Sequence, residues 1–152
     1  MRRPVLLIWL LWFAAVLSAD AATGRVLKVL PHFVDLQGRH TLSPSLFERD
    51  AYQAYLRQHT TNISGIRFDV HWKVKGDSFG PLRLRVEVRG AASENLPSKA
   101  ILESAITSSR FSRWTFLPLT GEDYVRFGQI TAWRATLWEG DQLLAEHKSF
   151  LW

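Results

Sequence analysis

Hydrophobic side chains take every second position in two central segments of the chain. They are Ile66, Phe68, Val70, Trp72 and Val74 in residues 66–75, and Leu82, Leu84, Val86 and Val88 in residues 82–89. Charged and polar side chains fill the positions between them. A period of two is typical of a β-strand with one buried and one solvated face. The pattern therefore predicts two such strands, joined by a loop at residues 76–81 that is rich in glycine, proline and polar residues.

If these two strands pair, their charged residues favour one register of the pairing over another. Val70 opposite Leu84 brings opposite charges together, whereas Trp72 opposite Leu84 produces three like-charge pairs. Like charges directly opposite one another destabilise a sheet. We therefore favour the first register for a paired arrangement. The alternative is that the two consecutive strands lie in different sheets of a sandwich.

Residues 43–58 have the pattern of a helix. It begins either at Ser43, which is followed by Pro44, or at Ser45, which makes a capping box with Glu48. Apolar side chains recur at helical spacing and form one stripe, Phe47, Ala51, Ala54 and Tyr55, which Tyr52 and Leu56 widen. A helix of this length is marginal in water by itself. We therefore expect the stripe to dock on a sheet.

Further extended segments are predicted on both sides of this central region. Residues 25–36 are interrupted by Pro31, which indicates an edge or bent strand. Residues 97–107 fit a short strand or one turn of helix, and residues 114–119 fit a strand. Residues 130–139 and 142–152 flank Gly140-Asp141, a two-residue loop with glycine first, and predict a hairpin that pairs Trp138 with Leu143. The alternation fails later in this hairpin, so we expect a bulge near residues 145–148.

The N-terminus predicts a cleavable secretory signal peptide over residues 1–21. Arg2 and Arg3 precede an apolar run at residues 5–17, and small residues follow it. Cleavage after Ala19 or after Ala21 fits the small-residue pattern. The apolar run covers only about 20 Å as a helix, which is short of the roughly 30 Å hydrocarbon core of a bilayer.

The remaining residues, 22–152, are enough for one domain with a single core. The chain has no cysteine, which is unlike the disulfide-stapled small secreted modules of animals and favours a bacterial periplasmic or extracellular setting. The formal net charge of the whole chain is +5. This modest excess favours anionic neighbours. The scattered basic residues match no nucleic-acid-binding module, so no nucleic-acid partner is expected.

The series of short strands predicts a mainly β protein, an antiparallel β-sandwich with one inserted amphipathic helix. Residues 119–124, with Tyr124 ahead of the strand near Trp133 and of the terminal hairpin, resemble a tyrosine corner. The resemblance is to immunoglobulin-like or fibronectin-III-like domains and covers residues 63–152. The chain departs from that pattern in its lack of a cysteine pair, its helix after the first strand, and the six residues that separate Tyr124 from the next strand.

The sequence gives little support for a catalytic site or a metal-binding site. The neighbouring acids Glu122 and Asp123 fit solvated surface, and no serine lies in a nucleophile elbow. His32, Asp35 and His40 are the candidate metal ligands, but their spacing matches no template. We therefore expect no catalytic residues, no metal and no cofactor.

The favoured function is a non-catalytic binding domain that contacts an envelope protein or an anionic envelope component. The candidate contact face comprises Arg67, Lys73, Lys75, Arg83, Arg85 and Arg89. An alternative is a carbohydrate-binding module that uses Trp138 or Trp152, since Trp72, Trp114 and Trp133 are expected in the core. A small hydrolase is the third alternative.

Overall fold

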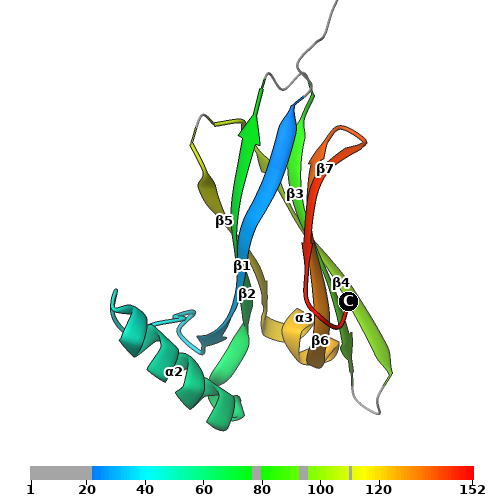
Figure 1. Cartoon of the computed structure of the whole chain (residues 1–152). Helices are drawn as coiled ribbons and strands as arrows, with labels where there is room; N and C mark the ends of the chain where they lie inside the picture. Colours follow the sequence, from blue (N-terminus) through cyan, green and yellow to red (C-terminus); the bar gives the residue numbers. More distant parts are fainter. Residues whose placement is uncertain (1–21, 77–79, 93–95, 110) are drawn as a thin grey trace, which may run out of the picture.

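Two antiparallel sheets packed face to face form the body of the molecule (Figure 1). The computed structural model describes residues 22–76, 80–92, 96–109 and 111–152. The predicted leader at residues 1–21 and part of the loop predicted at 76–81 lie outside these described residues.

The first sheet has the strand order β1-β2-β5 and the second has the order β4-β3-β6-β7. The strands of the first sheet are β1 (Thr23–Asp35), β2 (Ile63–Lys75) and β5 (Arg113–Thr120). Those of the second are β3 (Leu82–Ala91), β4 (Pro97–Ile106), β6 (Gln129–Glu139) and β7 (Gln142–Lys148). Helix α2 (Leu46–Gln58) and the 3-10 turn η1 (Thr60–Asn62) connect β1 to β2, and α3 (Gly121–Phe127) connects β5 to β6. The predicted mainly β sandwich with one inserted helix is confirmed.

The core lies between the two sheets and is built from the alternating segments. Phe68, Val70 and Trp72 of β2 are buried against Leu84 and Val86 of β3. Each such side chain contributes roughly 1.5–3 kcal/mol by leaving water. The predicted inward faces of both segments are therefore confirmed.

The pairing favoured for β2 and β3 is wrong. β2 pairs with β1 and β5, while β3 pairs with β4 and β6, so the two strands face each other across the core. The alternative, consecutive strands in different sheets, is the arrangement found. Charge patterns on two isolated strands cannot distinguish these cases, because the relevant neighbours are distant in sequence.

The expected docking of the apolar stripe of α2 is wrong for its four central residues and correct for Leu56, which widens it. Phe47 is 82% exposed and Ala51, Ala54 and Tyr55 are exposed as well, whereas Leu56 and Gln53 are buried. The Gln53 side chain accepts a hydrogen bond from the Phe33 backbone N–H and donates one to the Phe33 carbonyl, each at 2.8 Å. β1 is an edge strand, and this amide satisfies backbone groups that an edge leaves unpaired. These polar contacts of Gln53, together with the burial of Leu56, hold the helix against the body of the molecule.

The starts and ends of several elements refine the predictions. Ser45 is the N-cap of α2, and its hydroxyl accepts from the Glu48 N–H, so the second of the two predicted starts is correct.

The predicted pairing of Trp138 with Leu143 is confirmed, and Gly140 has the positive φ (54°) that a tight hairpin turn requires. The bulge falls at Leu144, just before the predicted region, and β7 ends at Lys148 rather than at residue 152. Residues 97–106 form a strand, which settles the two alternatives for that segment.

Candidate functional site

The outer face of the β1-β2-β5 sheet is the strongest candidate for a binding surface. Because Phe68, Val70 and Trp72 point into the core, the residues between them point outward. Cross-strand pairing then forms rows across this face: Lys28, His71 and Trp114 in one, and Leu30, Asp69 and Phe116 in the next. Arg67 lies in a third row, between His32 and Pro118.

Two aromatic side chains of the edge strand β5 are exposed on this face. Trp114 is 43% exposed and its ring stacks on that of His71, with the ring centroids 4.6 Å apart and the planes 6° from parallel. Phe116 is 53% exposed, and the Arg67 guanidinium lies 4.6 Å from its ring centroid. The expectation that Trp114 belongs to the core is therefore wrong. The alternation of β5 carries the signal, since Leu117 and Leu119 face inward and their neighbours must face outward.

Four cations lie at one end of the same face, and none of them has an ion-pair partner within the part of the chain that the structure describes. Arg25 pairs in register with Lys73, Lys75 follows on β2, and Lys28 lies beside His71. Among the described residues, no carboxylate lies within 4.0 Å of the side-chain nitrogens of these four residues. Arg25, Lys28 and Lys75 are exposed. The exposed aromatic rings thus adjoin an uncompensated positive charge.

At the other end of the face, Asp69 is buried in a charge network. It accepts hydrogen bonds from Arg67 Nε at 2.7 Å and Arg67 Nη2 at 2.9 Å, and His32 Nδ1 lies 3.3 Å from its Oδ2. Burial acts to raise the pKa of Asp69, but the hydrogen bonds from His32 and Arg67 outweigh it, so the pKa lies below its usual value. Arg67 Nη2 also donates to His40 Nε2 at 3.3 Å. Burial, followed by the charge of Arg67, lowers the pKa of His40.

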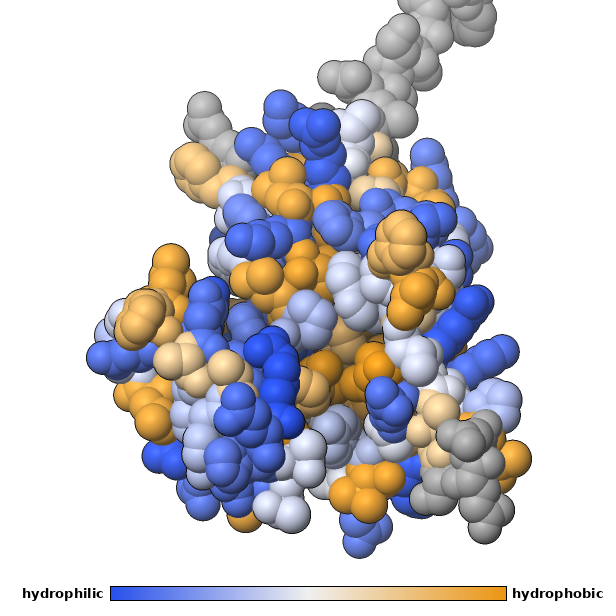
Figure 2. All heavy atoms as spheres, turned by 60° about the horizontal axis from the view of Figure 1, so that its bottom comes forward, coloured by the Kyte–Doolittle hydropathy of each residue, from blue (hydrophilic) through white to orange (hydrophobic). Residues whose placement is uncertain are grey.

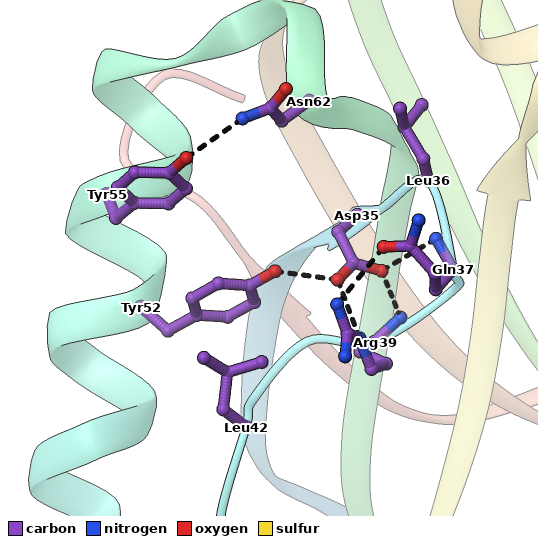
Figure 3. Close-up of a pocket in the computed structure, with 8 residues that line it drawn as sticks. All are labelled: Asp35, Leu36, Gln37, Arg39, Leu42, Tyr52, Tyr55 and Asn62. Carbon is purple, nitrogen blue, oxygen red and sulfur yellow. Dashed lines mark hydrogen bonds and ion pairs between the residues drawn. The ribbon is translucent and has the colours of Figure 1, made fainter.

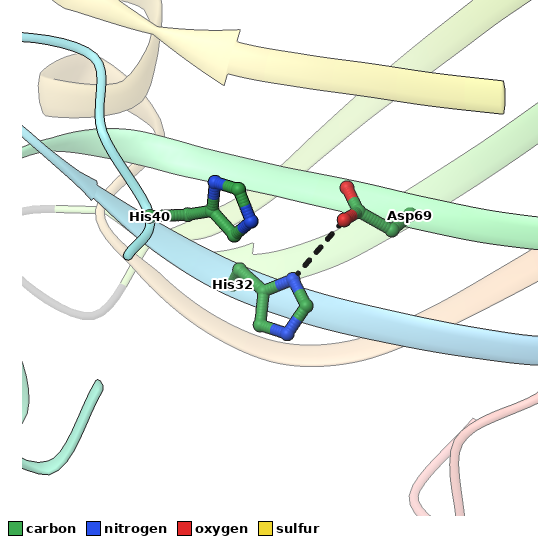
Figure 4. Close-up of side chains that lie close together, drawn as sticks. All are labelled: His32, His40 and Asp69. Carbon is green, nitrogen blue, oxygen red and sulfur yellow. Dashed lines mark hydrogen bonds and ion pairs between the residues drawn. The ribbon is translucent and has the colours of Figure 1, made fainter. Parts of the chain in front are cut away.

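This network brings together part of the predicted metal-ligand set. The ligand atoms of His32, His40 and Asp69 lie within 4.8 Å of one another (Figure 4), whereas Asp35 lies elsewhere. Arg67, however, already donates to both oxygens of Asp69 and to His40 Nε2, which are the atoms a metal ion would use. The guanidinium of Arg67 thus provides the positive charge that a metal ion would provide at this position. The cluster is best explained as an internal ion-paired network that covers part of the sheet.

Asp35 lies in a separate pocket of about 410 Å³ between the 36–42 loop and α2 (Figure 3). Its carboxylate accepts from Tyr52 Oη at 2.6 Å, Arg39 Nε at 2.8 Å, and the backbone N–H groups of Gln37 and Arg39. Burial opposes ionisation, but these hydrogen bonds outweigh it and lower the pKa of Asp35 to about 2. The carboxylate is fully used in holding the loop against the helix, so this pocket offers no free acid or base.

The structure divides the predicted basic face between two opposite sides of the sandwich. Arg67, Lys73 and Lys75 lie on the outer face of the first sheet, whereas Arg83, Arg85 and Arg89 lie on the outer face of the second. On that second face Arg85 and Arg83 pair with Glu103. Arg134 pairs with Glu87 and Glu146, and Lys148 pairs with Glu146. Arg89 and Lys99 lie opposite each other on this face, and neither has a carboxylate within 4.0 Å among the described residues.

The two tryptophans predicted as a sugar platform are engaged on this second face. The Trp152 ring centroid lies 3.8 Å from the Arg89 guanidinium carbon and 4.9 Å from that of Arg134. Trp138 donates from Nε1 to Thr136 Oγ1 at 2.8 Å, and both tryptophans are partly buried. They are therefore less available to a ligand than Trp114 and Phe116.

Comparisons with protein-family models, with curated proteins and with solved structures gave no match to this chain. Across the described residues, none of the helices has the length and apolar character needed to span a bilayer.

Proposed function

We propose that the protein is an exported, non-catalytic binding domain of the bacterial envelope, and that its ligand is an acidic polysaccharide bound on the outer face of the β1-β2-β5 sheet. The observation that carries this proposal is the combination of exposed aromatic rings with cations that have no carboxylate partner among the described residues. Trp114 and Phe116 offer the flat apolar surfaces, and Arg25, Lys28, Lys73 and Lys75 offer the positive charge.

Each half of this surface suits one part of such a ligand. The C–H face of a sugar ring packs on a flat aromatic side chain that is held rigidly by its neighbours. The stack of Trp114 on His71 and the contact of Arg67 with Phe116 hold the two rings in place. Carboxylate or sulfate groups of the polymer would then meet unpaired cations, which attract anions over about 10 Å at moderate salt.

The strand order supports the proposed likeness to immunoglobulin-like domains. In that family strands A, B and E share one sheet, and C, F and G share the other, with C′ added beside C. The orders β1-β2-β5 and β4-β3-β6-β7 correspond to A-B-E and C′-C-F-G. In this correspondence α2 is an insertion between A and B, and many domains of this class act as binding modules at cell surfaces. The predicted leader at residues 1–21 supports the extracytoplasmic location.

A binding experiment tests the proposal with the protein purified after export from a host cell. We expect binding to polygalacturonate, an acidic polymer, and at least about tenfold weaker binding to neutral dextran. Trp114→Ala, and separately the pair Lys28→Glu and Lys73→Glu, should each weaken binding about tenfold or more. Lys99→Glu, an exposed lysine in β4, is the matched control and should change binding less than about twofold.

Equal affinity for both polymers, or full binding by the Trp114→Ala variant, would overturn the proposal. Raising the salt concentration should weaken the binding of the wild type more steeply than that of the double lysine variant. A salt dependence that is unchanged by the two substitutions would also count against it.

A further inference from the structure

Helix α2 carries an apolar stripe that no other part of the described structure covers. Phe47, Ala51 and Ala54 are exposed, while the opposite side of the helix, with Gln53 and Leu56, is buried. Figure 1 shows that α2 projects from the sandwich, and Figure 2 shows hydrophobic side chains at the surface on the same side of the molecule. The stripe is thus free to contact another molecule.

The spacing of the stripe is that of a helix–helix seam. Gln58 extends the line of the stripe by one position. The intervals along Phe47, Ala51, Ala54 and Gln58 are four, three and four residues, which places these side chains on one line along the helix. The two alanines at the centre allow a second helix to approach closely. In an antiparallel pair, Ala51 of one helix lies opposite Ala54 of the other, and Phe47 lies opposite Gln58.

The charges beside the seam complement one another in the same arrangement. Asp50 and Arg57 flank the stripe on one edge, and they are seven residues apart. In an antiparallel pair of helices like edges meet, so Asp50 of each copy lies opposite Arg57 of the other. Within one chain these residues are about 10.5 Å apart along the helix axis, too far to pair. Asp50 now contacts Arg49, and among the described residues Arg57 has no carboxylate within 4.0 Å.

The balance of charge on α2 favours a protein partner over a lipid surface. Glu48 and Asp50 offset Arg49 and Arg57, so the helix carries no net charge beside its stripe. Helices that lie on membranes are rich in lysine and arginine on their polar face. A second copy of the chain supplies both the matching seam and the matching charges by two-fold symmetry.

We therefore propose that the protein forms a two-fold symmetric dimer through antiparallel packing of α2 against α2. The contact is confined to one short helix in each copy, so the interface belongs to the small class, below about 1,200 Å². We expect a dissociation constant in the micromolar range, about 1–100 µM. This proposal is independent of the polysaccharide site, which lies on the outer face of a sheet.

Sedimentation velocity of the exported protein from about 1 µM to about 1 mM tests it. The wild type should shift from monomer to dimer over this range. Phe47→Asp should abolish the dimer, and Asp50→Arg or Arg57→Asp alone should raise the dissociation constant about tenfold. The double variant Asp50→Arg with Arg57→Asp should recover most of the affinity, because it restores opposite charges between copies but not within one.

Glu122→Lys, an exposed charge reversal on α3, is the control and should leave dimer formation unchanged. Circular dichroism of each variant verifies that the domain is folded. A wild type that stays monomeric at about 1 mM overturns the proposal, as does a double variant that is no better than the single ones. Binding of the monomer to anionic lipid vesicles through Phe47 would likewise overturn it in favour of a lipid surface.

Discussion

The outer faces of the two sheets are both basic, but they use their positive charges differently. On the four-stranded sheet, cross-strand glutamates meet the arginines: Glu103 pairs with Arg85, and Glu87 with Arg134. At the cationic end of the three-stranded sheet, Lys28 and Lys73 have no carboxylate within 4.0 Å among the described residues. Similar residue types thus give one face on which most arginines are ion-paired and one whose cationic end has no carboxylate partner among the described residues.

The aromatic side chains differ between the faces in the same way. Trp152 lies against Arg89 and Arg134, so cation–π contacts hold it on its own sheet. Trp114 and Phe116 lie at an edge strand and remain about half exposed. A surface is thus a good candidate for binding when its aromatic rings stay exposed and its cations lack carboxylate partners, whatever its net charge.

The largest expected effect comes from Asp69, which is buried beside Arg67 and His32 on the outer face of the three-stranded sheet. Asp69→Ala would leave Arg67 without its carboxylate in a partly covered site, and we expect it to lower the free energy of unfolding by about 3 kcal/mol. Glu103→Ala, which removes the exposed partner of Arg85, should cost less than about 1 kcal/mol. Urea unfolding measures both. Equal losses would contradict the distinction between the buried network and the exposed ion pairs.

A smaller effect is expected from acid, through Asp35. Its pKa of about 2 lies below the unfolded value near 3.9, so its contribution to stability is fully present above about pH 4. That contribution is lost as the pH falls from about 4 toward 2, because the unfolded chain then binds the proton more readily. Unfolding free energy measured between about pH 2 and pH 7 should therefore decline at the acid end.

The matched variant for this measurement is Asp35→Asn, which removes the titrating group but keeps an acceptor for Tyr52. Its stability should be lower than that of the wild type at neutral pH and should fall less steeply below about pH 4. The lowered pKa of Asp69 leaves a residual slope in both proteins. An identical slope in the variant and the wild type would show that Asp35 does not account for the acid sensitivity.

The sequence predicts the strands of this fold well, because local alternation is sufficient to identify them. Residues 66–75 and 82–89 show which side chains enter the core, and Pro31 correctly indicates an edge strand. Pairing is different, since the neighbours of β2 are β1 and β5, and nothing local to residues 66–89 indicates them. The prediction for the helix fails for another reason. Gln53 of α2 forms hydrogen bonds with the backbone N–H and carbonyl of Phe33, and a hydrophobic pattern does not indicate such polar contacts.

The candidate site was predictable only in part. The outward direction of Trp114 and Phe116 follows from the inward positions of Leu117 and Leu119, so careful reading of the alternation finds them. The absence of carboxylates around Lys28 and Lys73 depends on which strands lie beside them, and therefore on the sheet order. The separation of Arg83 and Arg85 from Lys73 has the same cause. The direction of side chains within one strand can be predicted from the sequence, whereas contacts between side chains of different strands can be predicted only when the strand order is known.

The smallest expected effect concerns the outer face of the four-stranded sheet. Trp152→Ala removes a ring that lies against two guanidinium groups, and each such contact is worth about 0.5–1 kcal/mol at an exposed site. We expect thermal unfolding to report a loss of about 1–2 kcal/mol. Binding to acidic polymer should be unchanged, because Arg134 still pairs with Glu87 and Glu146 and the proposed site lies on the other sheet. Trp114→Ala should show the reverse: little change in stability and a clear loss of binding. If Trp152→Ala weakens binding as much as Trp114→Ala does, the four-stranded face takes part in ligand contact and the division between the two faces fails.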